Sequence, residues 1–259
     1  MTFQRPVLLI FHGGAGDRPA ERAMGEARLT GASRTAGAAL AAGFEAVILV
    51  TDTPGAIDAM PPGVLLDIDE PGAPFAFDSR LRALVGDYGL QKPAVMGSGS
   101  VPLLGVEEFR LIVEQLEARD SRFVTNNFFS SDLTAWTPGE ALFEVGAFAR
   151  DNVLPRRLRD EAGLAPVILP RTTATQFDLD TPADLEPSSR VTPTAATSGR
   201  SDAVSGIGVP QTGETHISWM CSSLMWIWPI APARLAARAL PGMARPSLIT
   251  ILPRTSRPA

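Results

Sequence analysis

Short apolar runs alternate with segments of helical periodicity along the first 186 residues of the chain. A short apolar run bounded by glycine, proline or aspartate is typical of a buried strand, and a helical segment after it indicates a βα unit. Repeated βα units predict an α/β domain, a three-layer αβα sandwich around a mainly parallel sheet. The runs that we interpret as strands are residues 7–11, 45–50, 64–68, 93–96, 123–128, 167–169 and 176–179.

Helices are predicted between these runs, over residues 33–42, 80–88, 106–119 and 138–150. The clearest is 106–119, in which apolar residues recur every third or fourth position. Gly43 marks the end of the first helix. In open α/β sheets, ligands bind at the carboxyl ends of the strands, where this chain places its Gly- and Asp-containing loops. We therefore expect the functional site along that edge.

A glycine-rich loop follows the first strand and is a candidate phosphate site. It contains Gly13, Gly14, Ala15 and Gly16, with Arg18 in G-x-G-x-R spacing. Glycines allow backbone N–H groups to approach a phosphate, and an arginine can bind phosphate oxygens with two hydrogen bonds. A tight βα turn without a ligand would explain the same glycines. The Rossmann pattern G-x-G-x-x-G is not met.

A late acidic stretch, residues 175–185, carries the second candidate. The pattern predicts a strand over Gln176–Leu179 bearing Asp178 and continuing to Asp180, then a helix that starts at Pro182. Carboxylates at a strand end beside a helix N-terminus suit a hydrated Mg²⁺ and a phosphate. Asp52, which follows the second strand, is a further candidate ligand. A capped helix after an ordinary strand is the alternative interpretation.

Three separated segments resemble the MobA-like and 2-phospholactate guanylyltransferase group of nucleotidyltransferases. The late stretch is similar to the group's "D-I-D-T-P-x-D-L", and the glycine loop has its G-x-G-x-R spacing. Residues 99–104 resemble its "G-D-x-P-L-L", with Ser100 at the position of an Asp that binds Mg²⁺ in the group. Since a hydroxyl is a poorer Mg²⁺ ligand than a carboxylate, this departure implies a weakened site or a catalytically silent domain.

The resemblance spans residues 5–186 and implies a Rossmann-like fold of the GT-A type. It also implies transfer of a nucleoside monophosphate from an NTP, such as GTP or CTP, to a small phosphorylated or cofactor-like acceptor with Mg²⁺. A nucleotide-sugar glycosyltransferase of the same fold is the alternative enzyme, and a silent nucleotide-binding domain the alternative outside catalysis. The implied site residues fall in three sets: Arg18 and Asp178 for catalysis; Gly13, Gly14, Ala15, Gly16, Arg18, Gly99 and Ser100 for the nucleotide; and Asp178, Asp180 and Asp52 for the metal.

Composition narrows the function classes. The chain has 259 residues, 45% of them hydrophobic, and a net charge of -5 without a basic cluster, which argues against a nucleic-acid partner. Cys221 is the sole cysteine, so multi-cysteine metal sites are excluded. No basic-then-apolar leader or long apolar span is present, so we expect a cytoplasmic protein with small-molecule partners and no membrane contact. His12-Gly13-Gly14 resembles hydrolase loops, but no G-x-S-x-G nucleophile motif accompanies it.

Two further features stay open at this stage. Asn126-Asn127 follows a strand and could bind a base or sugar, although paired asparagines are more often loop residues. Asp132, like Asp52, is a candidate to compensate for Ser100 at a metal site, although we favour the interpretation of Asp132 as a turn or N-cap residue. Residues 187–259 are rich in Ser, Thr, Pro, Ala and Arg and predict a low-complexity or disordered tail. A frame-shifted translation would explain the abrupt change; a partner-binding C-terminal helix is the alternative.

Overall fold

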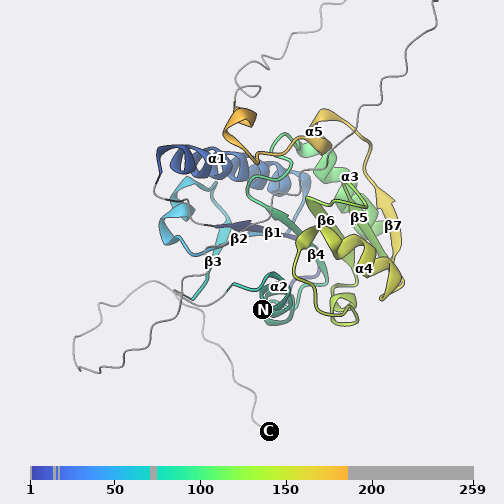
Figure 1. Cartoon of the computed structure of the whole chain (residues 1–259). Helices are drawn as coiled ribbons and strands as arrows, with labels where there is room; N and C mark the ends of the chain where they lie inside the picture. Colours follow the sequence, from blue (N-terminus) through green and yellow to red (C-terminus); the bar gives the residue numbers. More distant parts are fainter. Residues whose placement is uncertain (1, 14–15, 17, 71–74, 186–259) are drawn as a thin grey trace, which may run out of the picture. The chain divides into compact units, whose positions relative to one another are not determined.

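A computed structural model describes residues 2–13, 16, 18–70 and 75–185. These residues form an α/β domain around one seven-stranded sheet of order β3-β2-β1-β4-β6-β5-β7, which confirms the expected fold class (Figure 1). β6 runs antiparallel to both of its neighbours, and the other pairs are parallel. The strands are β1 (Pro6–His12), β2 (Ala46–Thr51), β3 (Val64–Ile68), β4 (Lys92–Gly97), β5 (Arg122–Thr125), β6 (Leu133–Thr137) and β7 (Ala165–Ile168).

Helices cover both faces of the sheet. α1 and α3 lie on one face and α2 on the other (Figure 1). The helices are α1 (Pro19–Ala42), α2 (Phe77–Asp87), α3 (Val106–Ala118), α4 (Leu154–Asp160) and α5 (Thr173–Gln176), with 3-10 turns η1 (Pro54–Ala59), η2 (Gly139–Phe143), η3 (Asp151–Val153) and η4 (Pro182–Asp184). Together the layers form the three-layer sandwich that the sequence pattern predicts.

The central strand β1 is apolar because it is buried on both sides. Leu8 and Ile10 face the core beneath α1 and α3, while Val7 and Leu9 face the core beneath α2 and α4. Alternate residues of a strand point to opposite faces, so a continuous apolar run fills both cores. This double burial anchors β1 and holds its last residue, His12, at the edge of the sheet.

α1 is much longer than the helix expected over 33–42. Its C-terminus is where the sequence placed it, with Gly43 at φ 105°, a left-handed conformation that favours glycine. Its N-terminus lies at Pro19, and residues 19–32 show no apolar period because most of them face solvent. The polar N-terminal part of α1 therefore has the sequence pattern of a loop, although proline at the first helical position is typical of a helix start.

The chain between β5 and α4 differs most from the prediction. Residues 138–150 contain only the short turn η2 rather than a helix, and β6 was not predicted at all. Gly139 packs so tightly that a Cβ atom there would lie 1.9 Å from the Leu90 carbonyl oxygen. The Arg82 guanidinium donates hydrogen bonds to the carbonyls of Val145 and Gly146, and these bonds hold the chain after the helical turn. These long-range contacts have no local sequence signal.

The predicted strand over Gln176–Leu179 is also wrong. α5 ends at Gln176, and the residues after it are extended but pair with no described strand. Thr172 caps α5 by accepting a hydrogen bond from the Thr175 N–H, so the turn forms before the acidic residues begin. The helix expected from Pro182 is the single turn η4.

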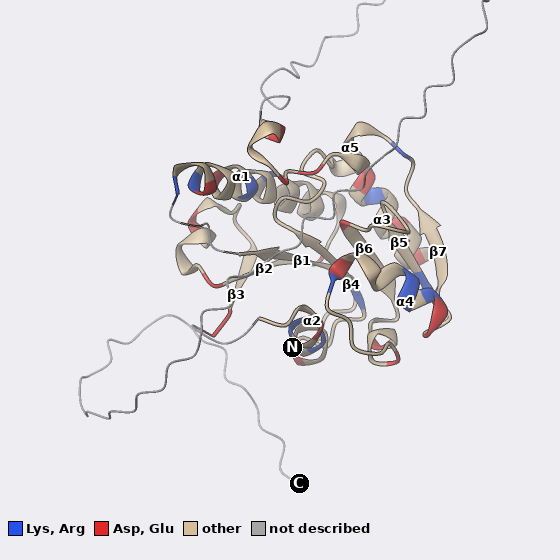
Figure 2. Cartoon of the chain, viewed as in Figure 1, with Lys and Arg blue, Asp and Glu red and all other residues tan. Residues whose placement is uncertain are grey.

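The predicted tail, residues 187–259, lies outside the described residues, as does its boundary at residue 186. Among the residues that are described, no helix is long and apolar enough to cross a membrane. Acidic and basic positions are mixed on the surface helices, including α1 and α4 (Figure 2).

Candidate functional site

Three central strands deliver the first part of the site. His12 ends β1, Thr51 lies beside it in β2, and Ser98 comes directly after β4. The Ser98 N–H donates to the Phe11 carbonyl at 2.9 Å, which extends the β1–β4 pairing by one step. As a result His12 Nδ1 lies 3.0 Å from Ser98 Oγ, and both side chains are buried. The carboxyl edge of the sheet is thus polar where β1 and β4 meet.

The loop after β4 touches the acidic segment that the sequence singled out. The Leu179 N–H donates to the Gly99 carbonyl at 3.0 Å, and a Cβ atom on Gly99 would lie 3.0 Å from the Leu179 carbonyl oxygen. Glycine is therefore required here by the close approach of two backbones. Since Leu179 lies between Asp178 and Asp180, this contact brings both carboxylates to the carboxyl edge.

Arg28, on α1, joins the two halves. Its Nε donates to the Leu179 carbonyl at 3.0 Å, and its Nη2 donates to the Asp180 carbonyl at 3.1 Å. The side chain also packs against Gly99. A guanidinium held in this way fixes the extended segment and places positive charge among the acidic residues. In the sequence Arg28 is a candidate for the basic residue that follows the glycine loop, but its contact with the acidic segment has no sequence signal, because residues 19–32 show no helical apolar period.

The acidic residues repel one another. Burial, and to a smaller extent the charges of Asp180 and Asp132, raises the pKa of Asp178 to about 8. The Leu179 N–H, which donates to Asp178 Oδ1 at 3.0 Å, and the charge of Arg28 act in the opposite direction. A carboxyl group in this environment favours the protonated form unless a cation joins the site.

The donor set fits Mg²⁺ with a nucleotide better than a metal bound by protein alone. No group of three or more His, Cys, Asp or Glu side chains in the described ranges could hold a metal ion. Mg²⁺ commonly uses one or two carboxylates and completes its octahedron with waters and substrate phosphates. Asp178 and Asp180 supply two carboxylates, and the unfavourable ionisation of Asp178 without a cation is what a divalent ion would relieve.

Asp132 is not the isolated turn residue that the sequence suggested. It lies before β6, accepts a hydrogen bond from Asn126 Nδ2 at 2.9 Å, and has a pKa raised by burial. Its charge acts on Asp178, so it belongs to the acidic group. Asn126 is a structural residue rather than an exposed base-binding one. It is buried, its Nδ2 also donates to the Thr175 carbonyl, and its Oδ1 accepts from the Asp132 and Leu133 N–H groups.

The glycine loop is described only in part, since Gly14 and Ala15 lie outside the described residues. Gly13 follows β1, and Arg18 is the exposed N-cap of α1. Glu21 Oε2 accepts a hydrogen bond from the Arg18 N–H at 3.1 Å. A Cβ atom on Gly16 would lie 2.2 Å from the same oxygen. Gly16 therefore leaves room for the Glu21 carboxylate, which holds the start of α1.

Two candidates remain, Asp52 and Ser100. Asp52 is exposed after β2, and its charge raises the pKa of His12 but is not among the causes that shift Asp178. Ser100 folds back over its own turn, because a Cβ atom on Gly97 would lie 3.0 Å from Ser100 Oγ. The next residue, Val101, is buried at φ 38°, which is a strained conformation for a β-branched side chain.

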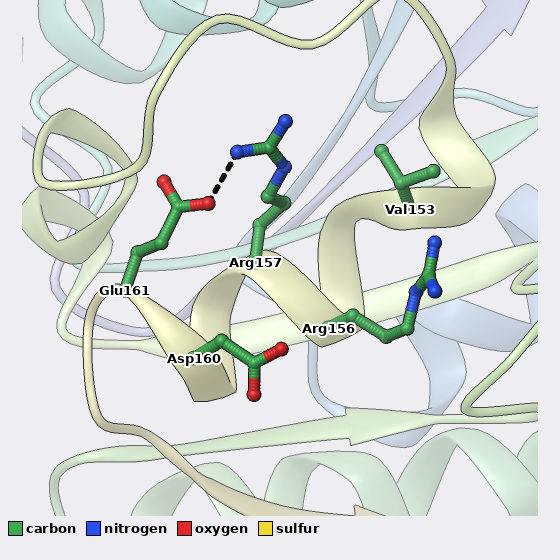
Figure 3. A pocket seen from close by; sticks show the side chains of 5 residues that line it. All are labelled: Val153, Arg156, Arg157, Asp160 and Glu161. Atoms are coloured by element: carbon green, nitrogen blue, oxygen red, sulfur yellow. Dashed lines mark hydrogen bonds and ion pairs between the residues drawn. The ribbon is translucent and has the colours of Figure 1, made fainter.

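A separate hollow of about 350 Å³ lies over η3 and α4. Val153, Arg156, Arg157, Asp160 and Glu161 line it, and Arg157 forms an ion pair with Glu161 (Figure 3). None of the site residues predicted from the sequence lines this hollow. Its charged residues come from α4 and its C-terminal end alone, so other elements contribute no convergent groups suited to catalysis.

The sheet order, the antiparallel β6 and the layers of helices define an α/β fold that this chain shares with several solved structures. A nucleotidyl transferase from Methanothermobacter thermautotroptrophicus (Mth528) has this fold, with a TM-score of 0.53 and 17% identity over 71% of this chain and 96% of that one. Rv0371c from Mycobacterium tuberculosis H37Rv matches with a TM-score of 0.51 and 16% identity over 72% of this chain and 98% of that one.

CMP:2-keto-3-deoxy-manno-octonic acid synthetase, in a structure complexed with CTP, is a third match. Its TM-score is 0.50, with 12% identity over 71% of this chain and 97% of that one. No protein-family model matches the sequence, and no curated protein matches it either. At these identities the matches establish the fold.

Proposed function

We propose that this chain is a nucleotidyltransferase that uses Mg²⁺ to transfer a nucleoside monophosphate from an NTP to a small acceptor, with release of pyrophosphate. The observation that supports this most is the contact between the β4 loop and the acidic segment, made by the Leu179–Gly99 hydrogen bond and the Arg28 side chain. Two proteins of the same fold add support, since one is called a nucleotidyl transferase and another was solved with CTP.

In this proposal each part of the edge has a role. Asp178 and Asp180 hold the Mg²⁺, and the amides of Gly13 to Gly16 together with Arg18 bind the triphosphate. Gly99 and Ser100 lie beside the nucleotide. The ion supplies neutralisation of phosphate charge when bound. The chain's own contribution is to position the reactants and stabilise charge, and no nucleophilic side chain is required for in-line transfer.

The nucleotide and the acceptor follow from the resemblance and from the neighbours rather than from the geometry. CTP or GTP is the expected donor, and the acceptor is a small phosphorylated or cofactor-like molecule, as in the MobA-like and 2-phospholactate guanylyltransferase group. The glycosyltransferase alternative would be favoured by preferential binding of a UDP-sugar over the free NTPs.

The direct test is pyrophosphate release from each NTP with Mg²⁺ across a panel of phosphorylated acceptors. We expect release with at least one pair, and a loss of about tenfold or more in Asp178→Asn and Asp180→Asn, a size that removal of groups around a metal commonly produces. Glu117→Gln, an exposed substitution at the end of α3, is the control and should keep wild-type activity.

A catalytically silent nucleotide-binding domain is the second candidate, and Ser100 is the observation that favours it. NTP binding without pyrophosphate release for any acceptor would support that candidate. Ser100→Asp separates the two further, because a carboxylate at this position should raise the affinity for Mg²⁺ in the NTP complex if residue 100 faces the ion. Unchanged Mg²⁺ affinity would contradict the alignment of residues 99–104 with the metal-binding motif.

A further inference from the structure

His12 and Ser98 form a buried polar pair that the proposed function does not use. The two residues come from different strands, with His12 at the end of β1 and Ser98 directly after β4. Only 7% of His12 and 5% of Ser98 is exposed. A distance of 3.0 Å joins His12 Nδ1 and Ser98 Oγ. Buried polar side chains carry a desolvation cost, so a pair at the carboxyl edge of the sheet invites a functional explanation.

The chemistry of Ser98 selects the tautomer of the histidine. Within the described part of the chain, His12 Nδ1 is the partner of the Ser98 hydroxyl. Burying a hydroxyl group without an acceptor for its proton costs more free energy than burying a hydroxyl group with an unused lone pair. Ser98 therefore donates to Nδ1, and the ring proton of neutral His12 resides on Nε2.

The second ring nitrogen opens toward the site. Among the described residues, the buried side-chain nitrogen or oxygen without a hydrogen-bond partner is Arg122 Nε. His12 Nε2 is therefore not a buried atom without a partner. Because Nε2 also has no protein partner, it must reach space accessible to solvent or ligand. The charged groups that act on the ring are Asp52, after β2, and Arg28, on α1. Both lie at the carboxyl edge of the sheet.

The ring stays neutral near neutral pH. Burial lowers the pKa of His12, the charge of Asp52 raises it to a smaller extent, and the charge of Arg28 lowers it. A neutral imidazole with its proton on Nε2 is a hydrogen-bond donor that Ser98 leaves available at the carboxyl edge of the sheet. Its natural partner is an anionic oxygen, and Arg28 nearby favours an anion at the same place.

We propose that His12 binds an anionic ligand oxygen, that of a nucleotide phosphate, through Nε2–H, and that Ser98 is the positioning residue that fixes the ring in this tautomer. The proposal rests on the proposed function, because that function supplies the phosphate. It adds a donor from the central strand to the glycine-loop amides and Arg18. It also gives the serine after β4 a role distinct from that of Ser100.

Three substitutions separate binding from packing. His12→Gln retains an N–H donor near the position of Nε2, His12→Leu retains volume without a donor, and Ser98→Ala removes the tautomer control. The probes are the four NTPs with Mg²⁺, titrated calorimetrically into the full chain, and thermal denaturation verifies that each variant is folded.

We expect His12→Leu to bind the preferred NTP about tenfold to 100-fold more weakly, the effect of one hydrogen bond to a charged group. His12→Gln should stay within about threefold of wild type, and Ser98→Ala should lie between them. Nitrogen-15 spectra of the imidazole provide an independent readout. Wild type should show the proton on Nε2 of His12, and Ser98→Ala should show mixed tautomers. His216→Gln assigns the second histidine signal.

Two results would overturn this role. One is a wild-type ring with its proton on Nδ1, and the other is His12→Leu binding NTP as tightly as wild type. Failure of the wild-type protein to bind any NTP would overturn the proposed function and the phosphate contact with it. In that event the tautomer spectra would still report on the Ser98 contact, so the two failures are distinguishable.

Discussion

Asp178 combines the two properties expected of a ligand-dependent carboxylate, because it is half-buried and faces other acids. Its charged form is disfavoured by burial first, and then by the charges of Asp180 and Asp132. The sequence identified both Asp178 and Asp180, because two acids just before a Thr-Pro form a pattern of neighbouring residues. For Asp132 the local pattern favours a turn residue, because Asp132 joins the other two acids only through folding of the β5–β6 loop.

This environment predicts a pH dependence of stability in the metal-free protein. The pKa of Asp178 is about 8 in the folded chain and near its ordinary acidic value when unfolded. Between those values the folded state binds the extra proton, so the free energy of unfolding falls as pH rises from about 4 to about 8. In urea unfolding with EDTA, the free energy of unfolding of Asp178→Asn should rise relative to wild type by about 1–3 kcal/mol between pH 5 and pH 9. This is less than the full pKa shift would give, because the side chain is partly exposed to solvent.

The control for that experiment is Glu117→Gln, whose stability should follow the wild-type pH profile because its side chain is exposed on α3. Parallel profiles for wild type and Asp178→Asn would contradict the placement of Asp178 among the acids. Added Mg²⁺ with the preferred NTP should flatten the wild-type dependence, since a cation stabilises the carboxylate.

Glu21 yields a second prediction for a single residue. Its carboxylate accepts the Arg18 N–H, which lies in the loop where the proposed function places the triphosphate. A phosphate bound there would meet this negative charge at the start of α1. We expect Glu21→Gln to bind NTP about two- to fivefold more tightly, the effect of one charge at a helix N-terminus. Calorimetric titration measures it, and weaker binding would indicate that Glu21 supports the loop instead.

The segments that form the site differ in how well the sequence predicted them. Apolar runs located β1, β2, β3 and β4 within a residue or two. Burial on both faces leaves a strong signal in β1, β2 and β4, whereas β3 is an apolar edge strand that is partly exposed. The pattern predicts a strand after α5, because polar and apolar residues alternate there. The same alternation also occurs in extended chain that pairs with no strand. The local pattern cannot distinguish a paired strand from an unpaired extended segment. The contact that holds this segment, the Leu179–Gly99 hydrogen bond, joins residues that are distant in the sequence.

This contact predicts the effect of a substitution in the β4 loop. Gly99→Ala would place a Cβ atom 3.0 Å from the Leu179 carbonyl oxygen and 3.2 Å from Arg28, so the acidic segment must move. We expect a loss of NTP binding of about tenfold or more and a stability cost of about 1–3 kcal/mol. Calorimetry and urea unfolding measure the two effects.

Gly37→Ala is the matched control, because that glycine lies in α1 with its nearest neighbouring atom 4.0 Å from a built Cβ atom. Alanine in a helix interior should stabilise the chain by about 0.5–1 kcal/mol and leave NTP binding unchanged. Equal behaviour of the two variants would argue against a close approach between the β4 loop and the acidic segment.

At the scale of the whole molecule, the alternation of strands and helices was sufficient to predict the fold class. The nucleotidyl transferase and CMP:2-keto-3-deoxy-manno-octonic acid synthetase structures share it at 17% and 12% identity. Fold physics constrains which edge of the sheet can bind a ligand, and the sequence placed its candidates there. The way in which α1 supplies Arg28 required coordinates, because it depends on a helix start that the apolar pattern did not reveal.

Paramagnetic relaxation with Mn²⁺ in place of Mg²⁺ tests the central claim most directly. In the protein saturated with NTP, Mn²⁺ should broaden the backbone amide signals of His12, Gly99 and Asp178, and Asp178→Asn should abolish the broadening. The amides of Arg156 and Arg157, in the hollow over α4, serve as the internal comparison. Broadening centred on α4, or equal in wild type and Asp178→Asn, would contradict a nucleotide–metal site at the carboxyl edge of the sheet.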